Sequence, residues 1–176
     1  MHKFVVISGC SSGGKSTLLA ELSRRGYNVV EEPGRRLVNE KAMSQGVALP
    51  WVDMSEFLRR CIAIALADRA SVGSPCDWVF FDRSLVDAAA SLQYLTGESA
   101  LAMLGQAYRY HHRVFLTPPW PEIYVTDTER RHDQTAALAE YSRLLKAYPS
   151  LGYEVSILPK VSVAERADFI LEMLEE

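Results

Sequence analysis

Cysteine and long apolar runs are scarce in this chain of 176 residues. The cysteines are Cys10, Cys61 and Cys76, an odd number at irregular spacing without a C-x-x-C pair. They therefore predict neither a disulfide framework nor a zinc site. No apolar run approaches the roughly 20 residues that cross a bilayer, and no cationic and apolar leader precedes the first strand-like segment. We expect a protein of the reducing cytoplasm with no membrane partner.

An excess of either charge is also missing. Lysine and arginine number 19 and aspartate and glutamate 22, which gives a net charge of −3. A nucleic-acid partner is not expected, because such binding needs a strong basic surface. The chain has no internal repeat, low-complexity tract or linker of Pro/Gly/Ser composition. With 48% hydrophobic residues, the composition predicts one globular domain over residues 1–176, as a monomer or homodimer.

The most informative segment of the sequence has the G-x-x-x-x-G-K-[ST] spacing of a phosphate-binding P-loop. It consists of Gly9, Cys10, Ser11, Ser12, Gly13, Gly14, Lys15, Ser16 and Thr17. Glycines let backbone N–H groups approach a phosphate, and the following helix directs its N-terminus at the same place. Lys15 is expected to reach the β and γ phosphates and Ser16 to coordinate Mg²⁺. ATP with Mg²⁺ is therefore the predicted ligand.

Strand-like and helical segments alternate along the chain. The expected strands are Phe4–Ser8, Tyr27–Val30, Trp78–Phe81, Arg113–Leu116 and Gly152–Leu158, and the expected helices are Leu18–Leu22, Pro50–Arg69, Val86–Leu95, Glu98–Tyr110, Thr135–Ala147 and Val163–Leu174. This alternation predicts a three-layer α/β fold in which helices cover both faces of a five-stranded parallel sheet. Ligands of such sheets bind at the carboxyl ends of the strands.

Carboxylates follow two of these strands. Asp82 ends an apolar strand and is expected to hold Mg²⁺ directly or through water; the alternative is a cap for the next helix. Glu32 is the candidate to orient or deprotonate an acceptor hydroxyl, with Glu31 as its competitor. Adjacent residues of a strand point to opposite faces, so only one of the two can face the site. Both could also be a solvated pair without a role.

Arginines accompany the carboxylates. Arg35 and Arg83 could clamp a phosphate or carboxylate of the acceptor through paired hydrogen bonds. For Arg35 the alternative is a solvated helix face. Both residues are therefore candidates for substrate binding.

A second pair of arginines follows the fourth strand. Arg130 and Arg131 would stabilise charge on the transferred group from a lid over residues 117–134. The alternative is a surface ion-pair cluster with Glu129 and Asp133. The two arginines are therefore candidate catalytic residues.

Three short motifs resemble those of nucleoside and nucleotide kinases. Asp82–Ser84 is similar to the acidic-Arg-Ser motif of deoxyribonucleoside kinases. Glu32–Arg35 and Asp127–Arg130 resemble elements of the kinase-like AAA domain family, which includes the ribosylnicotinamide kinase part of the bacterial NAD regulator. The resemblance implies a sheet order of 2-3-1-4-5, a lid after strand four and an adenine pocket that involves Pro159 and Val161.

Other P-loop classes lack support in the sequence. Arg83 follows Asp82 at the position where oligomeric AAA+ motors have an acidic residue, and the chain has no room for their helical lid domain. A guanine-reading N/T-K-x-D element and the L-S-G-G-Q element of transporter ATPases are both missing. The leading hypothesis is a kinase that transfers the γ-phosphate of ATP to a hydroxyl or phosphate of a nucleoside-like molecule. The alternatives are an ATPase or nucleotide-dependent switch that acts on a protein, and a binding module without turnover.

Overall fold

The protein folds around one parallel sheet. The computed structural model describes residues 2–11, 13–42, 51–120 and 130–175, with 41–42 and 130–133 described for the backbone only. The strands are β1 (Phe4–Gly9), β2 (Asn28–Val30), β3 (Val79–Asp82), β4 (Arg113–Thr117) and β5 (Glu154–Ile157). They are all paired in parallel in the order β2-β3-β1-β4-β5. The predicted α/β fold and its strand order are confirmed.

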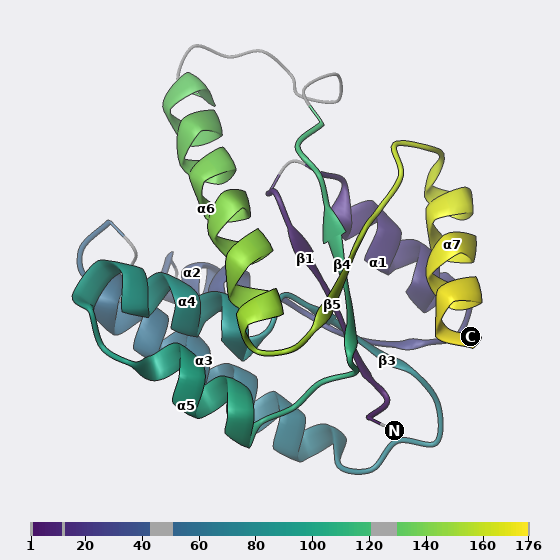
Figure 1. The fold of residues 1–176 in the computed structure, drawn as a ribbon, viewed down its shortest axis with the longest axis horizontal. Coiled ribbons are helices and arrows are strands. Elements are labelled where there is room, and N and C mark those ends of the chain that lie inside the picture. The colour runs from purple at the N-terminus through teal and green to yellow at the C-terminus, as the bar shows by residue number, and fades with distance from the viewer. Residues whose placement is uncertain (1, 12, 43–50, 121–129, 176) are drawn as a thin grey trace.

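Helices cover both faces of this sheet (Figure 1). One face carries α1 (Lys15–Arg24) and α7 (Val163–Glu175), and the other carries α3 (Met54–Val72), α4 (Leu85–Thr96), α5 (Ala100–Ala107) and α6 (Arg130–Ser150). The helix α2 (Pro33–Ala42) packs on α3 beside the end of β2. This arrangement has the three layers that the alternation of segments predicts.

Alternating strand residues form the cores on the two faces. In β1, Val6 packs among side chains of α3, α4 and α6, while Val5 and Ile7 pack against α1 and α7. Phe80 and Phe81 of β3 divide in the same way. All six residues of β1 are buried. A central parallel strand is covered on both faces, so its apolar residues need not alternate with polar ones.

Several helices begin at other residues than the sequence predicts. The helix α3 begins at Met54 and not at the predicted Pro50, because Asp53 caps it. The helix α2 begins at Pro33, directly after Glu32, where we expected a polar strand end; proline at a first helical position is preset for helix. The helix α6 begins at Arg130, before the predicted Thr135, because its charged first turn conceals the amphipathic pattern. In the described part of the chain, no helix combines the length and apolarity needed to cross a membrane.

Candidate functional site

The P-loop connects β1 to α1 at the carboxyl edge of the sheet. Gly9 has a φ of 111°, and a Cβ there would lie 2.4 Å from the carbonyl oxygen of Thr117. Gly14 is the N-cap of α1 with a φ of 74°, in the left-handed region. Both positions favour glycine, because an L side chain would be strained at these φ values. The sequence spacing thus predicted a local structure that only glycine accommodates well.

Backbone and threonine contacts hold this loop against β4. The amide of Cys10 donates to the carbonyl of Thr117 at 2.9 Å. In return, Thr117 Oγ1 donates to the carbonyl of Ser8 at 3.1 Å. Cys10 is buried and Ser11 is exposed, whereas Ser12 lies outside the described residues. The loop is therefore anchored to the end of β4.

Lys15 and Asp82 are charged groups buried at this edge, each 4% exposed. Burial, aided by the positive charge of Arg83, lowers the pKa of Lys15. Burial likewise raises the pKa of Asp82, and the attraction of Lys15 opposes this effect only in part. Both charged forms are disfavoured in the protein without a ligand, so each group would gain from a partner of opposite charge.

The oxygens near Lys15 fit a magnesium ion. Asp82 Oδ1 is buried and has no hydrogen-bond partner among the described residues. The Ser16 hydroxyl, exposed in the first turn of α1, accepts a hydrogen bond from Arg35 Nη1 at 3.1 Å. The described residues contain no cluster of three His, Cys, Asp or Glu ligands. A hard carboxylate and a hydroxyl suit Mg²⁺, which takes few protein ligands when phosphates supply the rest.

Asp82→Asn is expected to stabilise the protein without nucleotide at neutral pH. The raised pKa of Asp82 means that the folded state binds this proton more tightly than the unfolded chain. Stability is therefore lost as the pH rises through the two pKa values, and asparagine removes that loss. We expect a gain of ~1 kcal/mol, or about 2–4 °C in a thermal melt at pH 7.5, which shrinks at acidic pH. The exposed control Asp77→Asn should have little effect, and a lower melting temperature for Asp82→Asn would mean that the attraction of Lys15 dominates.

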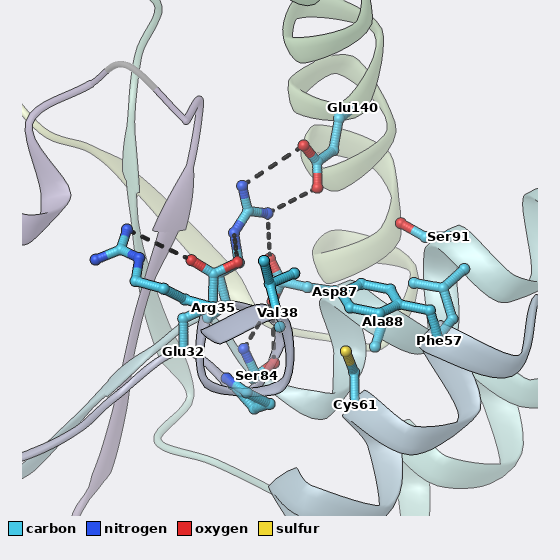
Figure 2. A pocket seen from close by; sticks show the side chains of 14 residues that line it. Glu32, Arg35, Val38, Phe57, Cys61, Ser84, Asp87, Ala88, Ser91 and Glu140 are labelled. Carbon is cyan, nitrogen blue, oxygen red and sulfur yellow. Dashed lines mark hydrogen bonds and ion pairs between the residues drawn. The ribbon is translucent and has the colours of Figure 1, made fainter. Parts of the chain in front are cut away.

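A cavity of about 390 Å³ has one polar and one apolar wall (Figure 2). It shares Glu32 and Arg35 with a second pocket, which Ser16 and Asp82 line. The apolar wall comes from α2, α3 and α4, and the polar wall from the ends of β2 and β3 and from α6. The lining residues are Glu32, Pro33, Gly34, Arg35, Val38, Phe57, Leu58, Cys61, Arg83, Ser84, Asp87, Ala88, Ser91 and Glu140. Its shape and lining are those of a small-molecule site.

Arg83 is the centre of the polar wall. Its Nη1 lies 2.7 Å from Glu140 Oε1 and 3.5 Å from Asp87 Oδ1, and its Nε lies 3.4 Å from Glu32 Oε1. Burial alone would lower the pKa of Arg83, but the three carboxylates outweigh burial and raise it. Arg83 is also the one described non-glycine residue with a positive φ, 63°. Its strained backbone and fixed side chain mark a candidate functional position.

Glu32, and not Glu31, faces the cavity. Both residues follow the end of β2, but Glu31 is exposed while Glu32 contacts Arg83 and lies 3.7 Å from Arg35 Nη2. The alternative role of Asp82 as a helix cap is wrong. The cap of α4 is Ser84, whose Oγ accepts from the amide of Val86.

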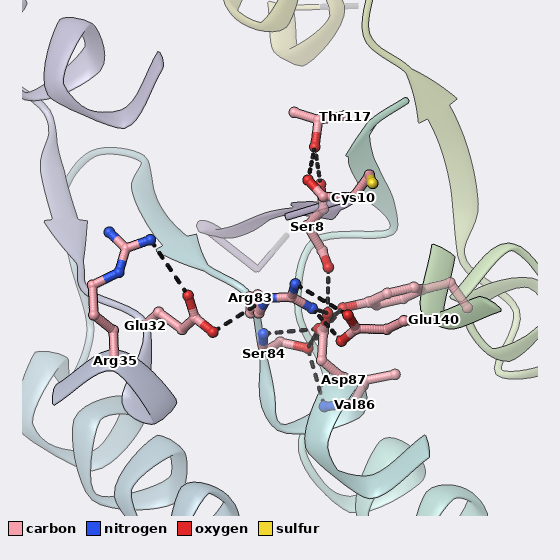
Figure 3. Close-up of polar contacts among 11 residues, drawn as sticks. Ser8, Cys10, Glu32, Arg35, Arg83, Ser84, Val86, Asp87, Thr117 and Glu140 are labelled. Atoms are coloured by element: carbon pink, nitrogen blue, oxygen red, sulfur yellow. Dashed lines mark hydrogen bonds and ion pairs between the residues drawn. The ribbon is translucent and has the colours of Figure 1, made fainter. Parts of the chain in front are cut away.

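A buried hydrogen-bond network around Asp87 escaped the sequence analysis (Figure 3). Asp87 accepts hydrogen bonds from Ser8 Oγ, from the amide of Ser84 at 2.9 Å and from Tyr148 Oη at 2.5 Å. Burial and the Asp87 carboxylate raise the pKa of Tyr148 well above its ordinary value, so the phenol keeps its proton. The network connects Ser8, near the end of β1 and just before the P-loop, to Arg83 in the cavity wall.

The structure does not test the roles of several predicted site residues. The proposed lid includes residues 121–129, which lie outside the described residues, as do the side chains of Arg130 and Arg131. Pro159 and Val161 lie between β5 and α7, at the same edge of the sheet as the P-loop. Pro159 is half-buried and Val161 is exposed. Their role in binding adenine stays a prediction.

A sequence profile described as AAA domain matches residues 4–166. The chain belongs to the AAA domain family. Comparison with curated proteins found no match.

Solved structures that resemble this AAA domain share its fold at low identity. Thymidylate kinase from Candida albicans is 13% identical over 98% of this chain and 90% of its own, with a TM-score of 0.69. Deoxyadenosine kinase from M. mycoides with bound dATP is 14% identical over 99% of this chain and 100% of its own, with a TM-score of 0.58. NadR protein in complex with NR is 19% identical over 99% of this chain and 51% of that one, with a TM-score of 0.65.

Proposed function

We propose that this AAA domain is a small-molecule kinase that transfers the γ-phosphate of ATP to an acceptor. The acceptor would bind in the 390 Å³ cavity that Glu32 lines, called the Glu32 cavity below. The observation that carries the proposal is the adjacency of two half-sites. Lys15 and Asp82 lie buried beside the P-loop. Glu32 and Arg35 line the 390 Å³ cavity and also a second pocket that Ser16 and Asp82 line, so the two half-sites adjoin. A switch that acts on a protein has no need of a small-molecule cavity with a polar wall beside its nucleotide site. The fold shared with nucleoside, nucleotide and shikimate kinases agrees with this function.

The charge of the cavity favours a hydroxyl acceptor over a phosphate acceptor. Three carboxylates, Glu32, Asp87 and Glu140, already surround Arg83 within 3.5 Å. An anionic group would have to displace one of them or lie beside all three. We therefore revise the proposed role of Arg83. It holds Glu32 in position and does not clamp a phosphate, so the acceptor is a neutral or cationic molecule with a free hydroxyl.

Each residue of the nucleotide half has a defined part in this proposal. The ammonium of Lys15 neutralises the β and γ phosphates. Ser16 and Asp82 would hold the magnesium ion, which offsets charge on the phosphates when bound. Glu32 orients the acceptor hydroxyl or accepts its proton. Close alignment of hydroxyl and phosphate in a site with little water supplies the catalysis.

The decisive experiment measures ADP release with a panel of acceptors. Neutral nucleosides, ribosylnicotinamide and shikimate-like polyols should include one that accelerates release far above the background rate. Nucleoside monophosphates are the matched anionic set and should give less acceleration. Acceleration only by monophosphates would overturn the hydroxyl assignment. Acceleration only by a protein partner would favour the ATPase or switch.

Mg-ATP is expected to raise the melting temperature, and Lys15→Ala to abolish the shift. A ligand at about 100 times its Kd stabilises by about 2.7 kcal/mol, or roughly 5–10 °C for a chain of this size. Lys15 is buried with a lowered pKa, so its removal should not itself unfold the protein. Lys146→Ala, an exposed lysine on α6, is the control and should keep the shift. An undiminished shift in Lys15→Ala contradicts the assignment of the P-loop.

A further inference from the structure

Arg166 is an arginine of the first turn of α7 that lies against the P-loop. It is 4% exposed, and its Nη1 donates a hydrogen bond to the carbonyl oxygen of Gly13 at 3.0 Å. A Cβ placed on Gly14 would lie 3.1 Å from both Nη1 and Nη2. The guanidinium carbon also lies 5.3 Å from the centre of the Trp120 ring. The cation is therefore enclosed between the phosphate-binding loop and an aromatic side chain.

No carboxylate among the described residues neutralises this cation. Its Nε is buried without a hydrogen-bond partner there, and burial lowers the pKa of Arg166. Arg83 and Arg25 differ, because each is paired with acidic side chains. An unpaired buried charge costs stability, so a protein that retains one gains when an anion binds nearby. The anion expected at a P-loop is a polyphosphate.

The bond from Arg166 also sets the direction of a loop amide. The described residues contain no cis peptide bond, so the Gly13 carbonyl and the Gly14 amide point in opposite directions. A donor that holds the carbonyl toward α7 turns the Gly14 N–H away from α7. Within the described segments this N–H makes no hydrogen bond. It is therefore available to a phosphate oxygen.

We infer that Arg166 is a positioning residue of the nucleotide site, which turns the Gly14 N–H toward the phosphates of a nucleoside triphosphate and adds positive charge beside them. This assignment deepens the proposed function, since it rests on the binding of ATP by the P-loop. It does not depend on which acceptor receives the phosphate. Neither the P-loop spacing nor the kinase-like motifs include Arg166.

The test compares Arg166→Met with Arg25→Met. Arg25 also anchors α7, through Asp168 at 2.6 Å and the carbonyl of Ala164 at 3.1 Å, but it is the C-cap of α1, at the opposite end of that helix from the P-loop. We expect Arg166→Met to weaken Mg-ATP binding at least about tenfold in calorimetric titration, in line with a lost charged hydrogen bond. Arg25→Met should stay within about twofold of the wild type. Arg166→Lys, which keeps the charge and a donor, should bind with intermediate affinity.

The outcomes separate this inference from the kinase proposal. Wild-type affinity in Arg166→Met, or an equal loss in Arg25→Met, overturns the role of Arg166. If Arg166→Met does not fold, the inference is tested by the affinity of Arg166→Lys and by the NMR resonance of the Gly14 amide in the wild type. This resonance should shift when Mg-ADP binds, and an unchanged resonance overturns the inference. A wild type that binds ATP but transfers no phosphate refutes the kinase proposal alone. A wild type that does not bind ATP refutes both.

Discussion

Glu32→Gln is expected to lower acceptor-dependent turnover by about 10²–10⁴-fold while the affinity for Mg-ATP changes little. Glutamine keeps the size of the side chain beside Arg83 and Arg35, but it loses the negative charge of the two ion pairs and cannot accept the proton of a hydroxyl. Glu32 lies 3.4 Å from Arg83 in the cavity wall, outside the P-loop segment, so loss of its charge should leave the phosphate cradle intact. Steady-state kinetics with the best acceptor and a binding titration with Mg-ATP measure the two quantities separately.

The neighbouring residue provides the control for this experiment. Glu31 follows the same strand, is exposed and does not line the 390 Å³ cavity, so Glu31→Gln should leave turnover within about twofold of the wild type. Equal losses of turnover and of ATP affinity in Glu32→Gln would identify a structural role. Unchanged turnover would remove Glu32 from the mechanism.

Asp87→Ala is expected to destabilise the protein by roughly 3–5 kcal/mol, a loss of about 6–20 °C in melting temperature. The buried carboxylate of Asp87 accepts hydrogen bonds from Ser8, Ser84 and Tyr148, and it also lies 3.5 Å from Arg83. Alanine would leave these buried donors without their acceptor, which costs more than the hydrogen bonds themselves. Chemical denaturation followed by circular dichroism measures the free energy of unfolding.

Two further variants apportion this effect. Tyr148→Phe removes a single hydroxyl and should cost about 1–2 kcal/mol. Asp77→Ala removes an exposed aspartate, with an expected change below about 0.5 kcal/mol. A loss below about 1 kcal/mol for Asp87→Ala would show that the network adds little to stability.

The sequence predicted the sheet well because its strands are short, apolar and separated by turn residues. Phe4–Gly9 is buried on both faces, and its run of apolar residues is unambiguous. The helix α2 escaped prediction because Pro33 and Gly34 are typical turn residues as well as acceptable starts of a helix. The start of α6 escaped for another reason, since its first turn is charged and carries no apolar period.

The candidate site was predictable where residues follow strand ends and hidden where they come from helices. Glu32, Asp82 and Arg83 follow strands, and parallel topology alone brings them together. Glu140 and Arg166 lie on α6 and α7, with no local signal that relates them to the cavity or the P-loop. Asp87 had a weak signal, because Ser84 three residues earlier forms a capping box with it.

The apolar wall of the Glu32 cavity and the P-loop come from different segments of the chain, which bears on how specificity for an acceptor could evolve. Val38, Phe57 and Ala88 form much of the apolar wall and lie on α2, α3 and α4, whereas the phosphate-binding segment lies earlier in the chain. If the proposed function holds, point changes in these three helices would alter the acceptor that the cavity recognises without altering the segment proposed to bind ATP. Related proteins could therefore come to accept different substrates through substitutions in the apolar wall while they keep the same P-loop.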